Sequence, residues 1–535
     1  MTQDSTAGNL ADDWSELAEA FGELQAFVQD AAREATAAHE VERGIFQRVL
    51  TIGRRAMAHY LAAQGTGDLG ETLTLPEGRT LRRLPQTHGR DYVSIFGRFR
   101  LERTVYGTRP GQKIELVPLD ARLALPEGQF SYVLEDWDQM LATELPYGQV
   151  SRFLERILGL RQHVDSLERM SRRMACDAEN ACWSLETPPA DEEGEILVES
   201  ADGKGVPIRR PADAPPIRSH QHQRGPKPDR KKIATVGAVY SVDRFHRTPE
   251  ELVAALFHDP QAVPQAAPQA VPQAAPQAAP QAAPGDDLSQ TPPPKRPRPQ
   301  HKRVYAQLTC EDEDGEVIQG LPAVFGWMDQ QVRQRHVPGQ PIVSLMDGQQ
   351  SLWEMKAIWQ DDLETVEILD LLHVTPRLWQ AAHLFHPAGS RSAENFVRAR
   401  VRLVLEGRVL SVVRGLRSMA TRRKLSPSKR KRLARICGYF EKNRSRMRYD
   451  EYLREGYPIA SGVIEGACRH VVKDRFERTG MSWTKVGAGA LLHLRSIAIS
   501  DQWAFFLKQR IEKATRRLYP GREALLTNDQ WALTI

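Results

Sequence analysis

Residues 460–483, ASGVIEGACRHVVKDRFERTGMSW, carry the start and stop signals of one helix. Ser461 is a candidate N-cap, and Gly480 stands where a helix commonly ends in a left-handed residue. Between them, apolar residues recur near the 3.6-residue period and form one stripe, which consists of Ile464, Cys468, Val471, Val472 and Phe476. The pattern predicts an amphipathic helix with one face packed against a core.

Glu465 begins a line of charges on this predicted helix. Arg469 and Lys473 follow one and two turns later on the same side. Two interpretations stay open from this segment alone. The three charges form a solvated salt-bridge ladder, or Glu465 is a catalytic carboxylate with cations beside it.

The composition is that of a soluble globular protein with several domains. The chain has 535 residues, of which 41% are hydrophobic and 26% charged. No window approaches the run of about 20 apolar residues that a transmembrane helix needs, so no membrane partner is expected. The N-terminus shows no secretory signal, and the five cysteines form no CxxC pair. We therefore expect a cytoplasmic, nucleoid-associated protein.

Positive charge is concentrated in two segments. Residues 391–448 contain 19 Lys and Arg against three Glu, and residues 204–232 contain nine against two Asp. The net charge is only +5, so the rest of the chain is acidic. Such segregation suits binding to a phosphate backbone, because each cation that meets a phosphate releases counterions. Solvated basic helices without a partner are the alternative.

A helix-turn-helix-like pattern precedes the first basic segment. Helices are predicted over 132–143, 149–158 and 164–183, and residues 159–163 form a short turn that opens on a glycine. The second helix of such a pair would enter a DNA major groove. The alternative is an ordinary helical hairpin.

Two predicted apolar strands, 196–201 and 342–346, run into Asp-Gly pairs at Asp202 and Asp347. The carboxyl ends of parallel strands commonly carry functional groups, and Glu465 lies on a later helix. An Asp-Gly pair alone is also an ordinary turn. The order of two strand-end aspartates, a basic insertion and a helix glutamate favours a shared site for divalent cations, because three converging carboxylates repel one another without metal.

Five segments resemble the ISKra-type bacterial insertion-sequence transposases, in order from roughly residue 45 to 510. They are SADGKGV at 200–206, MDG at 346–348, DLLH at 370–373, the helix segment at 461–483, and LLHLR at 491–495. The resemblance implies a ribonuclease H-like core with a catalytic Asp-Asp-Glu triad of Asp202, Asp347 and Glu465. The same three residues would hold two Mg²⁺ (or Mn²⁺) ions for phosphodiester cleavage and transesterification.

The resemblance also implies partners and further site residues. A transposase of this kind binds double-stranded DNA, both the terminal inverted repeats of its element and the target, and pairing two ends requires at least a dimer. Arg469, Lys473 and Arg475 would contact phosphate. Asp370-x-x-His373 is similar to a motif that lies near the active site in Mutator-like relatives, so His373 is a DNA-contact candidate, with a packed core histidine as the alternative.

Tryptophans near these motifs also have two interpretations. Trp353, Trp379 and Trp483 stack on an unpaired base near the cut, or they are buried core residues.

The predicted fold class is an α/β ribonuclease H-like core with a helical insertion, preceded by a mainly helical DNA-binding region. The predicted divisions are N-terminal helices at 1–70, a β-rich hairpin region at 71–125, the helix-turn-helix-like region at 126–190, core segments at 191–258 and 304–373, a disordered Pro-Gln-Ala loop at 259–303, the basic insertion at 374–455, and the last core segment at 456–535. A metal-dependent nuclease without strand transfer, or a non-catalytic DNA-binding protein derived from a transposase, are the alternative functions.

Overall fold

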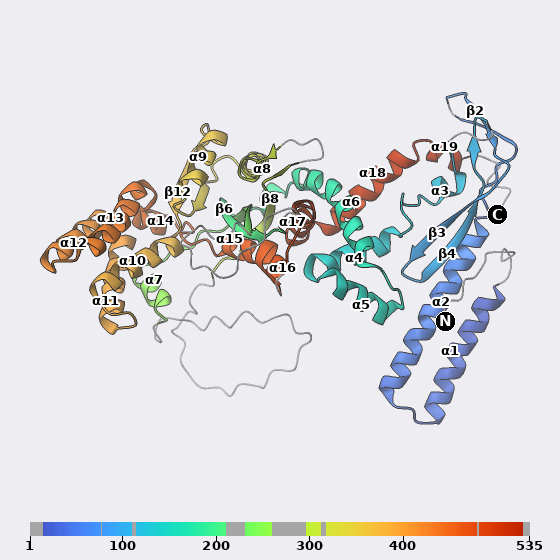
Figure 1. Cartoon of the computed structure of the whole chain (residues 1–535), viewed down its shortest axis with the longest axis horizontal. Helices are drawn as coiled ribbons and strands as arrows, with labels where there is room; N and C mark the ends of the chain where they lie inside the picture. Colours follow the sequence, from blue (N-terminus) through green and yellow to red (C-terminus); the bar gives the residue numbers. More distant parts are fainter. Residues whose placement is uncertain are drawn as a thin grey trace, which may run out of the picture. The chain divides into compact units, whose positions relative to one another are not determined.

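The computed structural model describes residues 14–75, 77–109, 114–209, 231–258, 296–311, 317–478 and 481–527. The chain divides into two compact units, one formed by residues 1–181 with 501–535 and the other by residues 182–500 (Figure 1). The predicted disordered loop lies mostly outside the described residues, as does the predicted helix exit at Gly480. None of the described helices is long and apolar enough to cross a membrane.

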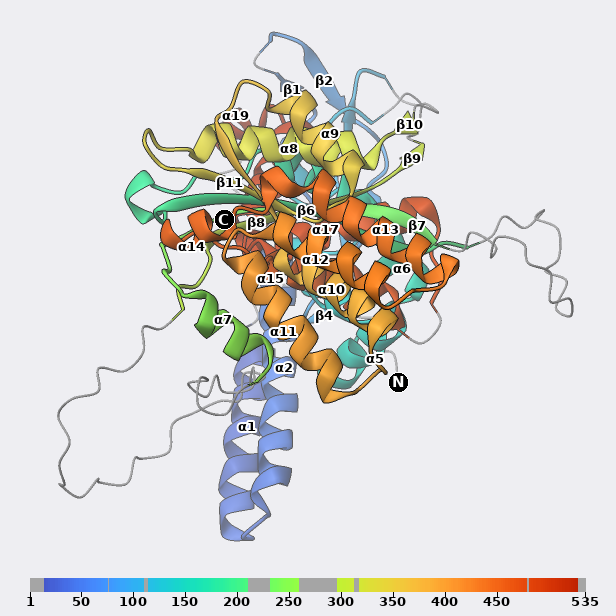
Figure 2. The ribbon, with the colours of Figure 1, turned by 90° about the vertical axis from the view of Figure 1, so that its left-hand side faces the viewer.

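The first unit begins with a helical hairpin. Helices α1 (Ser15–Arg33) and α2 (Ala38–Ala63) lie side by side in both views (Figure 1, Figure 2). Gly44 permits their close approach, because a Cβ atom there would meet the Phe27 ring at 2.2 Å. The Arg48 guanidinium covers the same ring at 3.8 Å from its centroid.

Two small sheets follow the hairpin. The first has the strand order β1 (Thr72–Thr74), β2 (Thr80–Arg83) and β5 (Tyr106–Gly107), and the second is a hairpin of β3 (His88–Ser94) and β4 (Gly97–Arg103). Gly97 has a φ of 128°, a backbone conformation that glycine adopts without strain. A short helix, α3 (Pro118–Arg122), ends this region.

Five helices complete the described part of the first unit: α4 (Tyr132–Glu144), α5 (Tyr147–Leu158), α6 (Val164–Trp183), α18 (Trp503–Leu518) and α19 (Arg522–Leu526). The Trp503 indole donates to Asp136 Oδ1 at 2.7 Å, and Arg510 pairs with Glu135 at 2.9 Å. The prediction that residues 456–535 all belong to the core is therefore wrong for residues 501–535, because these contacts join α18 to α4.

The second unit is built on one mixed five-stranded sheet, which confirms the predicted α/β class. Its strand order is β12 (Thr365–Leu369), β11 (Ile342–Met346), β6 (Ile196–Pro207), β7 (Lys231–Val242) and β8 (Gln300–Leu308). Strands β6, β7 and β8 pair antiparallel, whereas β11 pairs parallel with both β6 and β12.

The prediction that a strand ends at Asp202 is wrong. Strand β6 continues through Pro207, because Asp202 and the residues after it pair with the first residues of β7, from Val236 back to Lys231. Asp202 therefore lies within a long antiparallel ribbon, three residues beyond Glu199, where the registered parallel pairing with β11 stops.

Helices cover both faces of this sheet. Gly237 lies under α8 (Gly320–Arg335), where a Cβ atom would meet Val324 at 2.6 Å. The neighbouring residues Val236 and Ala238 point to the other face, since side chains alternate along a strand. There they share a core with the segments α15 (Gly462–Ala467), η3 (Cys468–Lys473) and α17 (Lys485–Ile499).

A helical layer fills the region predicted as the basic insertion. It contains α10 (Leu371–Phe385), α11 (Arg391–Leu405), α12 (Val409–Arg422), α13 (Pro427–Lys442) and α14 (Tyr449–Arg454). These helices share one apolar core with Val343 and Leu345 of β11. The remaining described elements are η1 (Ala190–Glu192), α7 (Pro249–Leu256), β9 (Cys310–Glu311), β10 (Val317–Ile318), α9 (Gln350–Trp359), η2 (Arg444–Arg446) and α16 (Asp474–Phe476).

Candidate functional site

Asp202 lies in β6, and Asp347 directly follows β11, the neighbouring strand of the central sheet. The registered pairing of these strands ends at Glu199 and Ser344, so each aspartate stands three residues beyond the last registered pair. The two segments stay close there, because Ser200 Oγ donates to the Leu345 carbonyl at 2.5 Å and the charge of Asp202 acts on the pKa of Asp347. The structure thus brings the first two predicted carboxylates together, both half-buried.

The pKa of Asp347 reflects the negative charges that surround it. Burial raises the pKa of its carboxyl above the ordinary value, and the negative charges of Asp202 and Asp370 raise it further. Two groups act in the other direction: the backbone N–H of Gln349 donates to Oδ1 at 2.8 Å, and His373 contributes positive charge. Asp347 thus belongs to a cluster of acidic side chains with Asp202 and Asp370, and His373 supplies positive charge beside them.

Asp370 and His373 form the third side of this cluster. Asp370 is buried at the N-cap of α10, where its carboxylate accepts from the Leu372 N–H at 2.8 Å and from the Ser461 N–H at 3.4 Å. His373 Nδ1 lies 3.2 Å from the same carboxylate. This hydrogen bond raises the pKa of His373, and the charges of Asp347 and Asp202 act in the same direction. The D-x-x-H segment therefore lies at the predicted site.

Glu465 is exposed on the short helix α15. Its helix reaches the site through Cys468, whose thiol donates to Asp202 Oδ2 at 3.6 Å. Burial and the neighbouring Asp202 charge raise the pKa of this thiol, so it stays protonated. No three His, Cys, Asp or Glu side chains within the described ranges form a group that could hold a metal ion. The triad is therefore a close pair of aspartates with Glu465 on an adjacent helix.

The helix that carries Glu465 is not uniform, in contrast to the prediction of one α-helix over 461–480. Residues 468–473 form a π-helical segment, which adds residues to each turn and changes the direction in which later side chains point. Arg469 and Lys473 are exposed, but the α-helical spacing that would align them with Glu465 is interrupted. Arg469 instead lies 3.4 Å from Asp474.

Arg475, a predicted DNA contact, lies away from solvent in this structure. It is fully buried, and its guanidinium lies 4.8 Å from the centre of the Trp483 ring. A phosphate has no access to a side chain in this position. Arg475 stands three residues after Val472 and seven after Cys468, so α-helical spacing also puts it on the apolar stripe.

Trp353 makes contacts that stabilise the turn at Asp347. Its indole N–H donates to the Asp347 carbonyl at 2.7 Å, and only 5% of the residue is exposed. The Arg446 guanidinium covers the ring at 4.0 Å. These contacts favour the interpretation of Trp353 as a core residue that positions Asp347. The sequence around Trp353 contains no motif that predicts this role.

The basic insertion presents its cations to solvent on α12 and α13. Seven of the exposed cations on these helices and in the turn between them are Arg414, Arg422, Lys424, Arg430, Lys431, Arg432 and Arg435. None of these seven forms an ion pair within the described part of the chain, whereas Arg417 makes a bidentate pair with Glu441 at 2.7 and 2.8 Å. The surface therefore carries positive charge that no described acidic side chain neutralises.

The helix-turn-helix-like segment has the predicted local geometry. Helix α5 ends at Gly159, whose φ of 68° is left-handed, and α6 begins at Val164 after a short turn. In the turn, buried Gln162 donates to both carboxylate oxygens of Asp138 on α4, at 2.7 and 2.8 Å. Burial raises the pKa of Asp138 to about 7.

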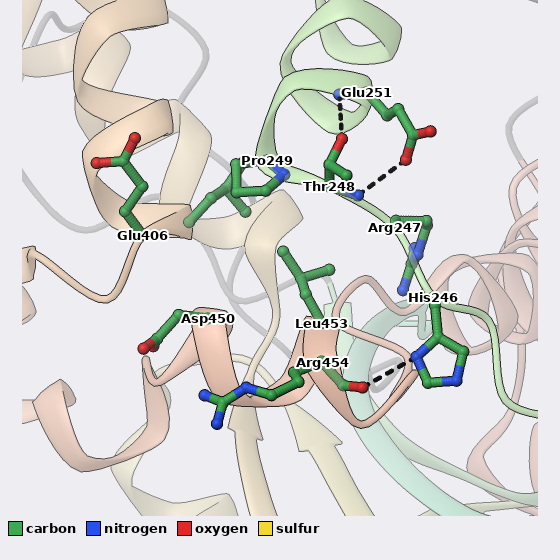
Figure 3. A pocket seen from close by; sticks show the side chains of 10 residues that line it. His246, Arg247, Thr248, Pro249, Glu251, Glu406, Asp450, Leu453 and Arg454 are labelled. Carbon is green, nitrogen blue, oxygen red and sulfur yellow. Dashed lines mark hydrogen bonds between the residues drawn. The ribbon is translucent and has the colours of Figure 1, made fainter.

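A separate cavity of about 750 Å³ lies between the start of α7, the turn between α11 and α12, and α14 (Figure 3). Thr248 and Glu251 form a capping box on one side, and His246 Nδ1 lies 2.9 Å from the Arg454 carbonyl. Glu406 and Asp450 line the opposite side (Figure 3). None of the predicted site residues lines this cavity.

Comparisons with known proteins do not extend this description. No model of a protein family matches the chain, and a search of curated proteins finds no match.

Proposed function

We propose that this chain is the DNA transposase of an insertion sequence, with the cluster around Asp202 and Asp347 as its catalytic centre. The observation that carries the proposal is the pairing of β6 with β11, since Asp202 and Asp347 each stand three residues beyond its last registered pair and the charge of Asp202 raises the pKa of Asp347. Asp370 and His373 lie at the same centre.

The sheet order supports a ribonuclease H-like core. Strands β6, β7 and β8 form an antiparallel meander, and β11 and β12 extend it in parallel. A core of this type needs its first strand in the middle of the sheet, next to the fourth, so that acids on both strands meet. Here those strands are β6 and β11.

The two aspartates are oxygen ligands of the kind that divalent cations prefer, but within the described residues no third His, Cys, Asp or Glu side chain completes a metal-binding group with them. Asp202 and Asp347 are half-buried and repel each other, and a cation between them would remove the repulsion that raises the pKa of Asp347. Asp202 and Asp347 would hold the metal, with Glu465 from the adjacent helix. When bound, two Mg²⁺ or Mn²⁺ ions supply activation of the attacking oxygen and stabilisation of the leaving oxygen.

The other residues of the chain position this centre and the DNA. Trp353 fixes the backbone of Asp347 through its indole hydrogen bond. His373 adds positive charge beside the aspartates, at a place where a phosphate would also be attracted. The exposed cations of α12 and α13, with Arg469 and Lys473, offer a surface for the DNA backbone. Segment α5–α6 is the candidate for reading the element ends.

A nicking assay tests this proposal. The substrate is duplex DNA from the flanks of the reading frame, incubated with the full chain and Mg²⁺. We expect the wild type to nick at the element ends, and Asp202→Asn and Asp347→Asn to lose at least about 100-fold in rate. Glu394→Gln, on α11, is the control acid and should cut normally. Nicking that persists in both aspartate variants would contradict the assignment of the centre.

The same assay separates the alternative functions. Joining of the freed 3′-hydroxyl to a second duplex distinguishes a transposase from a nuclease, which stops after cleavage. A non-catalytic DNA-binding protein gives no metal-dependent nicking at all. The variant Glu465→Gln tests the third residue by itself, and full activity of this variant would remove Glu465 from the triad.

A further inference from the structure

The helical hairpin α1–α2 exposes large apolar side chains that its own two helices do not cover. Phe21 and Val28 on α1 are 56% and 41% exposed, and Phe46 and Val49 on α2 are 44% and 48% exposed. Isolated exposed apolar residues are common on monomeric proteins, but a contiguous group marks an interaction surface. Their positions in the hairpin decide whether these residues are isolated or form a contiguous surface.

The contact between the helices identifies their inner faces. On α1 the buried residue Ala20 and the ring of Phe27 point towards α2, and Phe27 meets Gly44 and Arg48 there. Ala20 and Phe27 are seven residues apart, as positions on one coiled-coil seam are.

Three of the exposed residues fall on one flank of this seam. Phe21, Val28 and Val49 each directly follow a residue of the inner faces, namely Ala20, Phe27 and Arg48. In an antiparallel helix pair, the positions that follow the inner residues in this way lie on the same side of both helices. Phe46 stands two residues after Gly44, so it points away from α1, and the apolar strip consists of Phe21, Val28 and Val49.

The charges of the two helices indicate what covers this strip. Helix α1 contains four acidic residues and one arginine, whereas α2 contains four arginines and two glutamates. In a two-fold dimer with α1 of one copy against α2 of the other, opposite charges meet twice around the apolar strip. A second copy of this hairpin thus matches the surface in shape, polarity and charge.

We propose that α1–α2 is the dimerisation module of this protein, which forms a four-helix bundle with the hairpin of a second copy. Phe21, Val28 and Val49 form its second apolar seam, since two helices bury one seam and four bury more. All residues on which this inference rests lie outside 182–500, so it is independent of the catalytic proposal.

The test is the molar mass of the full chain in solution, measured by light scattering and sedimentation equilibrium. We expect twice the chain mass of 60.3 kDa for the wild type and a single-chain mass for Phe21→Glu/Val49→Glu. The dimer should weaken by at least about 100-fold, because charge enters a desolvated seam. Ile358→Glu is the matched control, since Ile358 on α9 is 70% exposed and lies outside the strip.

Circular dichroism must show the same helix content for each variant and the wild type. If the double glutamate variant loses helix, Phe21→Ser/Val49→Ser replaces it, because serine removes the apolar contact without charge. A monomeric wild type would overturn the proposal, and so would a folded variant that stays dimeric. The two proposals can fail separately. A glutamate variant that is monomeric but still nicks DNA at the wild-type rate per chain would support the dimerisation module alone. A dimeric wild type without nicking would contradict the proposed function alone.

Discussion

The Sγ atom of Cys468 lies 3.6 Å from Oδ2 of Asp202, so the segment that carries Glu465 touches the strand that carries the first aspartate. Cys468 is 4% exposed, and the raised pKa of its thiol keeps the proton on sulfur. The contact is a hydrogen bond from a neutral donor to a carboxylate, made by a side chain that belongs to the core between η3 and the sheet.

Enlarging Cys468 should therefore disturb the site. We expect Cys468→Leu to lower the free energy of unfolding by about 1–3 kcal/mol, because extra atoms in a packed contact force η3 away from β6. Nicking should fall with it. Cys468→Ser keeps a donor and a similar volume, and we expect it to retain most activity. Urea unfolding and the nicking assay measure both effects, and unchanged stability of the leucine variant would show that the contact is not closely packed.

The pair of His373 and Asp370 should make stability depend on pH. The pKa of His373 is raised above its ordinary value of 6.5, so the folded state binds this proton more tightly than the unfolded state. The stabilisation is complete below pH 6.5 and is lost as the pH rises through the raised pKa. We expect the difference in unfolding free energy between wild type and His373→Gln to shrink from about pH 6 to about pH 9.

The control for this pH effect is Asp370→Asn. It removes the partner charge but keeps a side-chain oxygen that can cap α10, because asparagine and aspartate are equally good N-cap residues. In this background the substitution of His373 should no longer change the pH dependence. A pH dependence that persists without Asp370 would point to another titrating group.

Asp138 should act in the same direction as His373, because burial raises the pKa of its carboxyl to about 7. Because the folded pKa lies above the unfolded value of 3.8, stability falls as the pH rises from 3.8 to about 7 and then stays constant. Asp138→Asn removes this loss and should stabilise the protein at pH 8 by an amount on the order of 3 kcal/mol.

Thermal unfolding at acid and alkaline pH measures this effect. The gain should vanish well below pH 3.8, where both states are protonated in the wild type. A stabilisation that is equal at both pH values would mean that the asparagine acts through its hydrogen bond to Gln162 and not through charge.

The basic surface of α12 and α13 should set the salt dependence of DNA binding. We expect Lys431→Ala and Arg432→Ala each to weaken binding for all sequences alike and to reduce the salt slope by about 1, because each cation releases one counterion. Arg417→Ala is the matched control, since Glu441 already neutralises that arginine. Equal losses for all three variants, from fluorescence anisotropy at several salt concentrations, would contradict a specific role of the unpaired cations.

Much of this protein follows from sequence patterns. The apolar runs with an aspartate after them mark β6 and β11, because alternating and continuous apolar residues are needed to bury a strand. The D-x-x-H segment and the basic insertion are visible as residue types at fixed spacing. The two helices flanking Gly159 follow from helical periodicity and from the left-handed preference of glycine.

Other features depend on contacts between distant residues, which no local pattern contains. The continuation of β6 past Asp202 is decided by its pairing with β7, and the packing of the Arg475 guanidinium over the Trp483 ring joins residues of separate segments. Residues 501–527 resemble any amphipathic helix, and only the bonds of Trp503 and Arg510 assign them to the first unit.

The segment 460–483 shows the same division. Its sequence by itself determined a helical segment with an apolar stripe and with Glu465 near its start, because periodicity and capping act within a few residues. Only the tertiary structure decided that Cys468, and not Glu465, makes the contact with Asp202, and that a π-helical turn redirects the residues that follow. Side-chain direction at a helix depends on where the sheet beneath it stands, and that position is set by strand pairings with residues far away in the chain.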